Sequence, residues 1–108
     1  MAQPADDFQA TTVQNRLRTR GLKHLRARKY GSTIIVESGP KNAAFKHFRL
    51  RRDTVHLWLL DMAGHGQRWE RTPFRAQLQE LVDMVIETFP WTLTDVAQNS
   101  ERTSDRKH

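Results

Sequence analysis

Residues 44–62 read AFKHFRLRRDTVHLWLLDM, and this stretch decides the fold. Apolar and polar residues alternate on both sides of Asp53-Thr54, with the period of two that is typical of half-buried strands. The dipeptide is short and polar enough to connect two antiparallel strands. The stretch therefore predicts a β-hairpin whose strands cover residues 44–52 and 55–62.

The register of this hairpin decides which side chains face away from the core. Pairing about the two-residue turn places four apolar residues on one face, which we expect to be buried: Phe48 opposite Leu59, and Leu50 opposite Leu57. The other face then carries Arg49 opposite Trp58, Arg51 opposite His56, and His47 opposite Leu60.

A second hairpin is expected upstream. Residues 22–30 and 32–38 flank Gly31, and Thr33-Ile34-Ile35-Val36 is rich in β-branched residues, which favour strands. A turn at Tyr30-Gly31 would direct Ala27 and Ile34 inward. Arg26 and Arg28 would then point to the same open face as the arginines of the other hairpin.

The residues after the second hairpin predict a short strand and a helix. Residues 67–71 form the expected fifth strand, and we expect Trp69 to lie in the core. Thr72 and Pro73 are favoured at the N-cap and the first position of a helix. One stripe of a helix is formed by Phe74, Leu78, Leu81, Val82, Val85 and Phe89. Pro90 ends this helix.

The pattern predicts an α+β fold: an antiparallel β-meander of four to five strands, followed by one C-terminal helix packed on one sheet face. Residues 21–94 form the single domain. Residues 1–20 are a flexible basic arm or a short helix, and residues 95–108 are a disordered tail. The expected core comprises Ile34, Val36, Phe48, Leu50, Leu57, Leu59, Leu78, Leu81, Val82, Val85 and Phe89.

The charge is divided unevenly along the chain. Residues 8–52 contain twelve Lys/Arg against one acid, Glu37, in a chain whose net charge is +6. A one-sided positive field attracts polyanions, of which nucleic acid is the commonest. Cysteine is absent, the N-terminus does not resemble a secretory signal, and the longest apolar run, residues 57–60, is too short to cross a bilayer. We therefore expect a cytoplasmic protein with no membrane partner.

Enzymatic signatures are lacking. The five histidines have no metal-binding spacing, and neither Ser32 nor Ser38 lies in a nucleophile motif. Asp61 and Glu70 could approach one another, but the neighbouring Arg68 and Arg71 favour a salt-bridge network. We expect no catalytic residue, no metal and no cofactor.

The open face predicts a platform for single-stranded nucleic acid, because arginines neutralise phosphates and an exposed ring stacks on a base. The expected binding residues are Arg26, Arg28, Lys29, Arg49, Arg51, His56 and Trp58. Alternatively, these arginines are only solvated, or an Arg–Trp pair merely supports the sheet. Trp58 and Leu60 could also belong to a buried second layer or to a homodimer interface, or the face could bind an acidic protein.

The order of elements between residues 22 and 93, a basic antiparallel meander followed by one helix, is similar to that of PUR repeats and Whirly-type domains. This resemblance rests on architecture and implies single-stranded nucleic-acid binding on the sheet. No individual residue is assigned a role from it.

Overall fold

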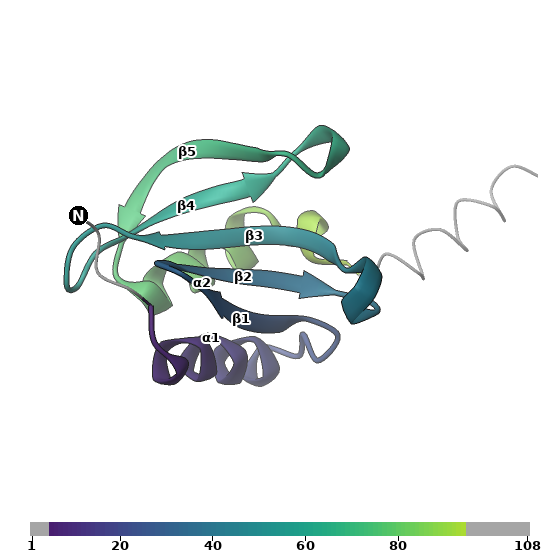
Figure 1. Ribbon diagram of the computed structural model, residues 1–108, viewed down its shortest axis with the longest axis horizontal. Coiled ribbons are helices and arrows are strands. Elements are labelled where there is room, and N and C mark those ends of the chain that lie inside the picture. Colours follow the sequence, from purple (N-terminus) through teal and green to yellow (C-terminus); the bar gives the residue numbers. More distant parts are fainter. Residues whose placement is uncertain (1–4, 95–108) are drawn as a thin grey trace, which may run out of the picture.

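The computed structural model describes residues 5–94, which form a five-stranded antiparallel sheet with strand order β1-β2-β3-β4-β5 and two helices (Figure 1). The elements are α1 (Asp7–Thr19), β1 (Arg26–Tyr30), β2 (Thr33–Ser38), β3 (Phe45–Arg52), β4 (Trp58–Ala63), β5 (Trp69–Ala76) and α2 (Leu78–Thr88). Short 3-10 turns are η1 (Lys41–Ala43), η2 (His65–Gln67) and η3 (Pro90–Leu93). The predicted α+β meander is confirmed, and the predicted tail, 95–108, lies outside the described residues.

The N-terminal helix α1 contributes residues to the core that the sequence did not predict. The sequence allowed either a flexible arm or a short helix in residues 1–20. The structure has a helix, which starts at a capping box of Asp6 and Gln9. Val13 and Leu17 are fully buried in the core shared with α2. Two apolar residues in a polar segment are a weak sequence signal, so only the packing distinguishes this helix from an arm.

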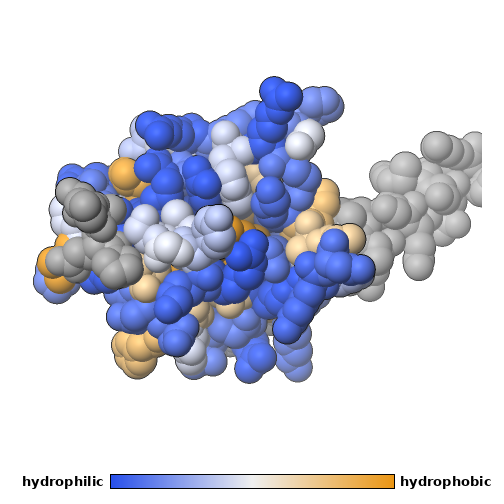
Figure 2. Space-filling model, in the orientation of Figure 1, coloured by the Kyte–Doolittle hydropathy of each residue, from blue (hydrophilic) through white to orange (hydrophobic). Residues whose placement is uncertain are grey.

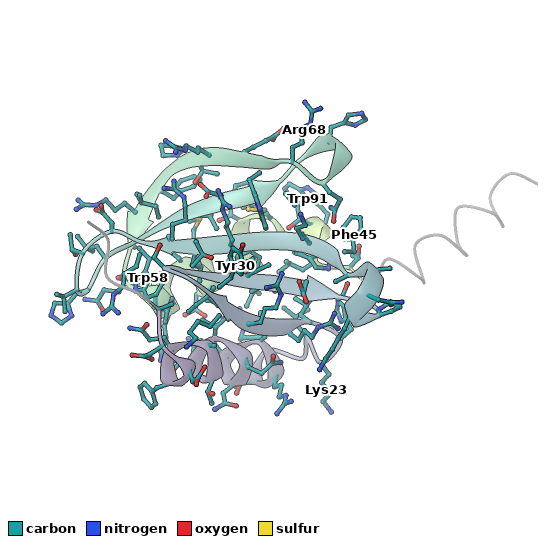
Figure 3. All side chains as sticks on the ribbon, in the orientation of Figure 1. Lys23, Tyr30, Phe45, Trp58, Arg68 and Trp91 are labelled. Carbon is teal, nitrogen blue, oxygen red and sulfur yellow. The ribbon has the colours of Figure 1, made fainter. Side chains whose placement is uncertain are left out.

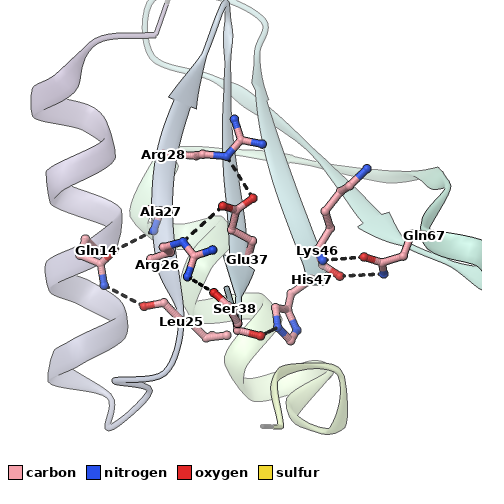
Figure 4. Close-up of polar contacts among 11 residues, drawn as sticks. Gln14, Leu25, Arg26, Ala27, Arg28, Glu37, Ser38, Lys46, His47 and Gln67 are labelled. Carbon is pink, nitrogen blue, oxygen red and sulfur yellow. Dashed lines mark hydrogen bonds and ion pairs between the residues drawn. The ribbon is translucent and has the colours of Figure 1, made fainter. Parts of the chain in front are cut away.

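Gln14 of α1 closes one edge of the sheet (Figure 4). Its amide nitrogen donates to the Leu25 carbonyl at 2.9 Å, and its amide oxygen accepts from the Ala27 backbone N–H at 2.7 Å. The side chain therefore satisfies two free backbone groups of this edge, one in β1 and one just before it, as a neighbouring strand would. Such a covered edge resists pairing with another chain.

In Figure 1, α2 and η3 are seen behind the strands, and α1 runs along the β1 edge of the sheet. Leu81, Val82 and Val85 of α2 are buried against the sheet, as predicted, together with Leu93 of η3. Seven of the predicted core residues are buried: Ile34, Val36, Phe48, Leu50, Leu81, Val82 and Val85. Leu78 and Phe89 are only half-buried. No helix of residues 5–94 covers the opposite face, which is called the open face below.

The predicted start of α2 is wrong. Strand β5 continues through Thr72 and Pro73 to Ala76, and α2 is capped by Gln77, whose capping box includes Glu80. Because β5 is an edge strand, Pro73 can lie in it without removing a required hydrogen-bond donor. The Thr72 hydroxyl donates to the Leu60 carbonyl at 2.8 Å, so it supports the sheet and not the helix.

The first hairpin turns one residue later than expected, which shifts the pairing of its two strands by two residues. Tyr30 pairs with Thr33, so the turn residues are Gly31 and Ser32, and Gly31 has a positive φ of 60°. Glycine supplies this left-handed conformation without steric strain. Because the shift is an even number of residues, Ala27 still faces the core and the arginines still face outward.

The register predicted for the second hairpin is also wrong, and here the faces change. A five-residue loop, 53–57, replaces the two-residue turn and is closed by a 2.9 Å bond from the Asp53 N–H to the Leu57 carbonyl. A two-residue turn needs left-handed backbone, which a β-branched threonine disfavours. Leu50 now pairs with Leu60, and Arg52 pairs with Trp58.

This odd shift turns β4 over. Trp58 and Leu60, predicted to be exposed, lie in the core, with only 2% of Trp58 accessible to solvent. Leu59, predicted to be buried, faces outward and is half-buried, and Leu57 lies half-buried in the loop. A strand has a side-chain period of two, so any odd error in register exchanges its faces.

Candidate nucleic-acid interface

The open face carries the side chains that alternate away from the helices, in three rows across the strands. The first row is Arg26, Glu37, Lys46 and Trp69; the second is Arg28, Ile35, Arg49, Asp61 and Arg71; the third is Tyr30, Thr33, Arg51, Leu59 and Arg75. Figure 2 shows a mostly hydrophilic surface with pale residues of intermediate hydropathy near its centre.

Positive charge is in excess on this face. The three rows hold seven Lys or Arg and two acids, Glu37 and Asp61, both of which are buried. Asp53, at the rim, accepts from the Arg75 guanidinium at 2.6 Å. Seven cations against three carboxylates leave four positive charges, so the face favours an anionic partner.

Asp61 lies under two arginines at the centre of the face. Its side chain is 0% exposed and accepts from Arg49 Nε at 2.7 Å and from Arg51 through both carboxylate oxygens, at 2.5 and 3.1 Å. Burial opposes ionisation, but the hydrogen bonds and charges of Arg51 and Arg49 outweigh it and hold the pKa of Asp61 below its usual range. Asp61 therefore stays ionised and fixes both guanidinium groups.

Glu37 has the corresponding position between the arginines of β1 (Figure 4). Its carboxylate accepts from Arg28 Nε at 3.0 Å and from Arg26 Nε at 3.3 Å, and the residue is 4% exposed. Ile35, also buried, lies between Arg28 and Arg49 in the register. The aliphatic stems of these arginines account for its burial on an otherwise polar face.

Trp69 is an aromatic residue of the open face, so the prediction that it lies in the core is wrong. The ring is half-buried, with the Lys46 ammonium 5.6 Å and the Arg49 guanidinium 4.7 Å from its centroid. A usable signal was present in the sequence: Trp69 and Arg71 are two residues apart in a strand and must share a face.

Tyr30 is a second aromatic residue that sequence reasoning left out of the site. It is 68% exposed, and the Arg28 guanidinium lies 5.8 Å from its ring centroid. Figure 3 shows it near the middle of the view toward the open face. Its spacing from Arg26 and Arg28 in β1 was the available signal, because every second residue of a strand points the same way.

Four of the seven predicted binding residues lie on the open face: Arg26, Arg28, Arg49 and Arg51. Lys29 points to the other side of β1, where its ammonium is 3.6 Å from Asp7 of α1. His56 is exposed in the loop 53–57. Trp58 is in the core beside the Arg52 guanidinium, 5.4 Å from its ring centroid, so it cannot stack on a base at this face.

A buried serine–histidine contact lies at the end of the sheet. Ser38 Oγ is 2.8 Å from His47 Nε2, and His47 Nδ1 is 2.8 Å from the Thr92 carbonyl oxygen of η3. Both side chains are buried, and the contacts attach η3 to the sheet. Among residues 5–94, no three His, Asp or Glu side chains are grouped so that they could hold a metal ion.

No protein-family model, curated protein or solved structure matches this chain. The similarity to PUR repeats and Whirly-type domains therefore rests on the order of elements alone, and α1 departs from the expected order. None of the helices in the described part of the chain is long and apolar enough to span a membrane.

Proposed function

We propose that this protein is a non-enzymatic nucleic-acid-binding protein that holds a single strand on the open face. One observation carries the proposal: the face combines an excess of four positive charges with two rings, the exposed Tyr30 and the half-buried Trp69. A positively charged groove or face with aromatic rings is the usual surface for unpaired nucleic acid.

The positions of the rings favour a single strand over a duplex. Tyr30 ends β1 at one edge of the sheet, and Trp69 begins β5 at the other. Four strand spacings of about 4.8 Å separate these edges by roughly 19 Å. A single strand crossing the sheet can place unstacked bases on both rings and its phosphates on the arginines between them. The bases of a duplex are stacked on one another and offer no such contact.

The buried carboxylates support this use of the arginines. Asp61 and Glu37 each engage guanidinium groups through Nε, as the 2.7 Å contact of Arg49 and the 3.0 Å contact of Arg28 illustrate. A fixed guanidinium loses less conformational entropy when it binds a phosphate. Contacts to phosphates and stacking on rings carry little sequence information, so we expect weak sequence preference.

Fluorescence anisotropy with single-stranded DNA, duplex DNA and RNA tests the proposal. Trp69→Ala and Tyr30→Ala should each weaken single-strand binding by about 1–3 kcal/mol and leave its salt dependence unchanged. Trp91→Ala is the matched control, because Trp91 is 67% exposed but belongs to η3, behind the sheet. Equal losses for Trp69→Ala and Trp91→Ala would contradict the assignment of the face.

The alternative partner is another protein. The homodimer expected from an exposed Trp58 and Leu60 has lost its basis, because both residues are buried in the core. An acidic protein could still bind the same arginines. If wild-type protein binds no oligonucleotide at low salt and binds an acidic polypeptide, the nucleic-acid proposal is wrong.

A further inference from the structure

The open face is not flat over its whole area. A hollow of about 500 Å³ lies where β1, β2 and the start of β3 meet η1. Its lining includes four cationic residues and one acid, Arg26, Arg28, Lys41, Lys46 and Glu37. This concentration of cations in a concave site points to an anionic ligand.

The single acid in the hollow does not neutralise it. Glu37 is buried and already engages two arginines, so four cations and one carboxylate leave three positive charges. A phosphodiester carries one negative charge, whereas a terminal phosphate carries about 1.5 to 2 at neutral pH. The charge of the hollow therefore fits a terminal phosphate better than an internal one.

Arg26 provides a second, independent observation. Its Nε contacts Glu37, its Nη1 donates to the Gly39 carbonyl at 2.5 Å, and its Nη2 is buried with no hydrogen-bond partner. Buried donors in folded proteins are nearly always paired. A phosphate oxygen entering the hollow, with a small shift of the overlying side chains, would supply the missing acceptor.

The aromatic ring of Tyr30 lies next to the cationic residues of the hollow. Along β1, Arg26, Arg28 and Tyr30 follow at every second residue, so neighbouring members are about 6.6 Å apart. Arg28 lines the hollow on one side and lies 5.8 Å from the Tyr30 ring centroid on the other. A nucleotide whose phosphate enters the hollow and contacts the outer guanidinium nitrogens of Arg26 and Arg28, which Glu37 engages through Nε, can therefore place its base on the Tyr30 ring.

We infer that the hollow is a subsite for a phosphomonoester, namely the phosphorylated end of a nucleic-acid strand or a mononucleotide, with its base on Tyr30. For a strand end, this inference rests on the function proposed above and adds to it the direction in which the strand crosses the sheet. The strand would begin at β1 and run across the sheet toward Trp69.

The test compares short oligothymidylates that differ only at their ends: 5′-phosphate, 3′-phosphate or hydroxyl at both. Wild-type protein should bind one phosphorylated form about tenfold more tightly than the hydroxyl form, because charge-assisted hydrogen bonds are added. Lys41→Ala should remove most of this difference. Lys23→Ala is the matched control, since Lys23 is exposed in the loop before β1 and does not line the hollow (Figure 3).

Thymidine monophosphate and inorganic phosphate separate this inference from the proposed function. If all oligonucleotides bind equally whatever their ends, the subsite is wrong and the single-strand platform stands. If no oligonucleotide binds but the mononucleotide does, and Lys41→Ala weakens it while Lys23→Ala does not, the subsite stands and the platform is wrong. If inorganic phosphate binds as tightly as the mononucleotide, Tyr30 contributes no stacking. Failure of every ligand to bind overturns both.

Discussion

Two buried carboxylates organise the two halves of the open face, and they do so differently. Asp61 is fully buried at the centre and holds Arg51 through both oxygens, with the shortest contact at 2.5 Å. Glu37 lies nearer the β1 edge and holds two arginines through single contacts of 3.0 and 3.3 Å. One of those arginines keeps a buried nitrogen without a partner.

This difference predicts which carboxylate contributes more to stability. Around Asp61, the strong contacts compensate for burying the charge and hold the centre of the sheet together. Around Glu37, the contacts are longer and spare donors remain beside the hollow. We therefore expect the arginines of both clusters to contribute to binding, and substitution of Asp61 to cost more stability than substitution of Glu37.

The largest expected effect tests the orientation of β4, on which the position of Asp61 depends. Leu60→Ala should reduce the free energy of unfolding by about 2–5 kcal/mol, because Leu60 is fully buried. Leu59→Ala on the same strand should cost about 1 kcal/mol or less, because that residue is half-buried on the open face. Denaturant unfolding monitored by circular dichroism measures both. The reverse order would restore the register predicted from the sequence.

The next effect compares the carboxylates directly. Asp61→Asn should lower the free energy of unfolding by about 3 kcal/mol, since it leaves two partly buried arginines without a counter-charge. Glu37→Gln should cost about 1 kcal/mol, because its arginine contacts are longer and more exposed. Denaturant midpoints provide the measurement. Equal losses would remove the distinction between the two clusters.

Acidification should weaken the Asp61 cluster. The native pKa of Asp61 lies below its unfolded value, so its stabilisation is complete above about pH 5 and is lost as pH falls through the native pKa. The contact with Arg16 likewise lowers the pKa of Asp83 and links α1 to α2. Asp61→Asn should therefore flatten the fall in melting temperature below pH 4. An unchanged acid limb would show that Asp61 does not contribute to it.

The smallest effect concerns binding at the two clusters. Arg28→Ala and Arg49→Ala should each lower the slope of log K against log salt by about one unit and weaken all sequences alike. Arg68→Ala, which removes an exposed arginine outside the three rows, should change the slope less. Anisotropy titrations over a range of salt concentrations measure this. Unchanged slopes for Arg28→Ala and Arg49→Ala would exclude phosphate contacts at both clusters.

The sequence predicts which face a strand residue occupies only when the pairing register is correct or is wrong by an even number of residues. In the first hairpin, the strand pairing is shifted by two residues from the predicted pairing, and Arg26 and Arg28 keep their faces. In the second, the three-residue error exchanged Trp58 with Leu59. Arg49 and Arg51 were placed correctly because they lie on β3, whose faces do not depend on how β4 pairs with it.

The sequence by itself determined the meander, the helical stripe of α2 and the concentration of positive charge, because alternation, periodicity and composition are local properties of a chain. Tertiary structure decided the rest. The loop closure at Asp53 and Leu57 set the face of β4, and the pairing of β5 with β4 brought Trp69 beside Arg49. Burial of Glu37 and Asp61 beneath arginines arises only when neighbouring strands are aligned, since Glu37 of β2 is paired with arginines of β1 and Asp61 of β4 with arginines of β3.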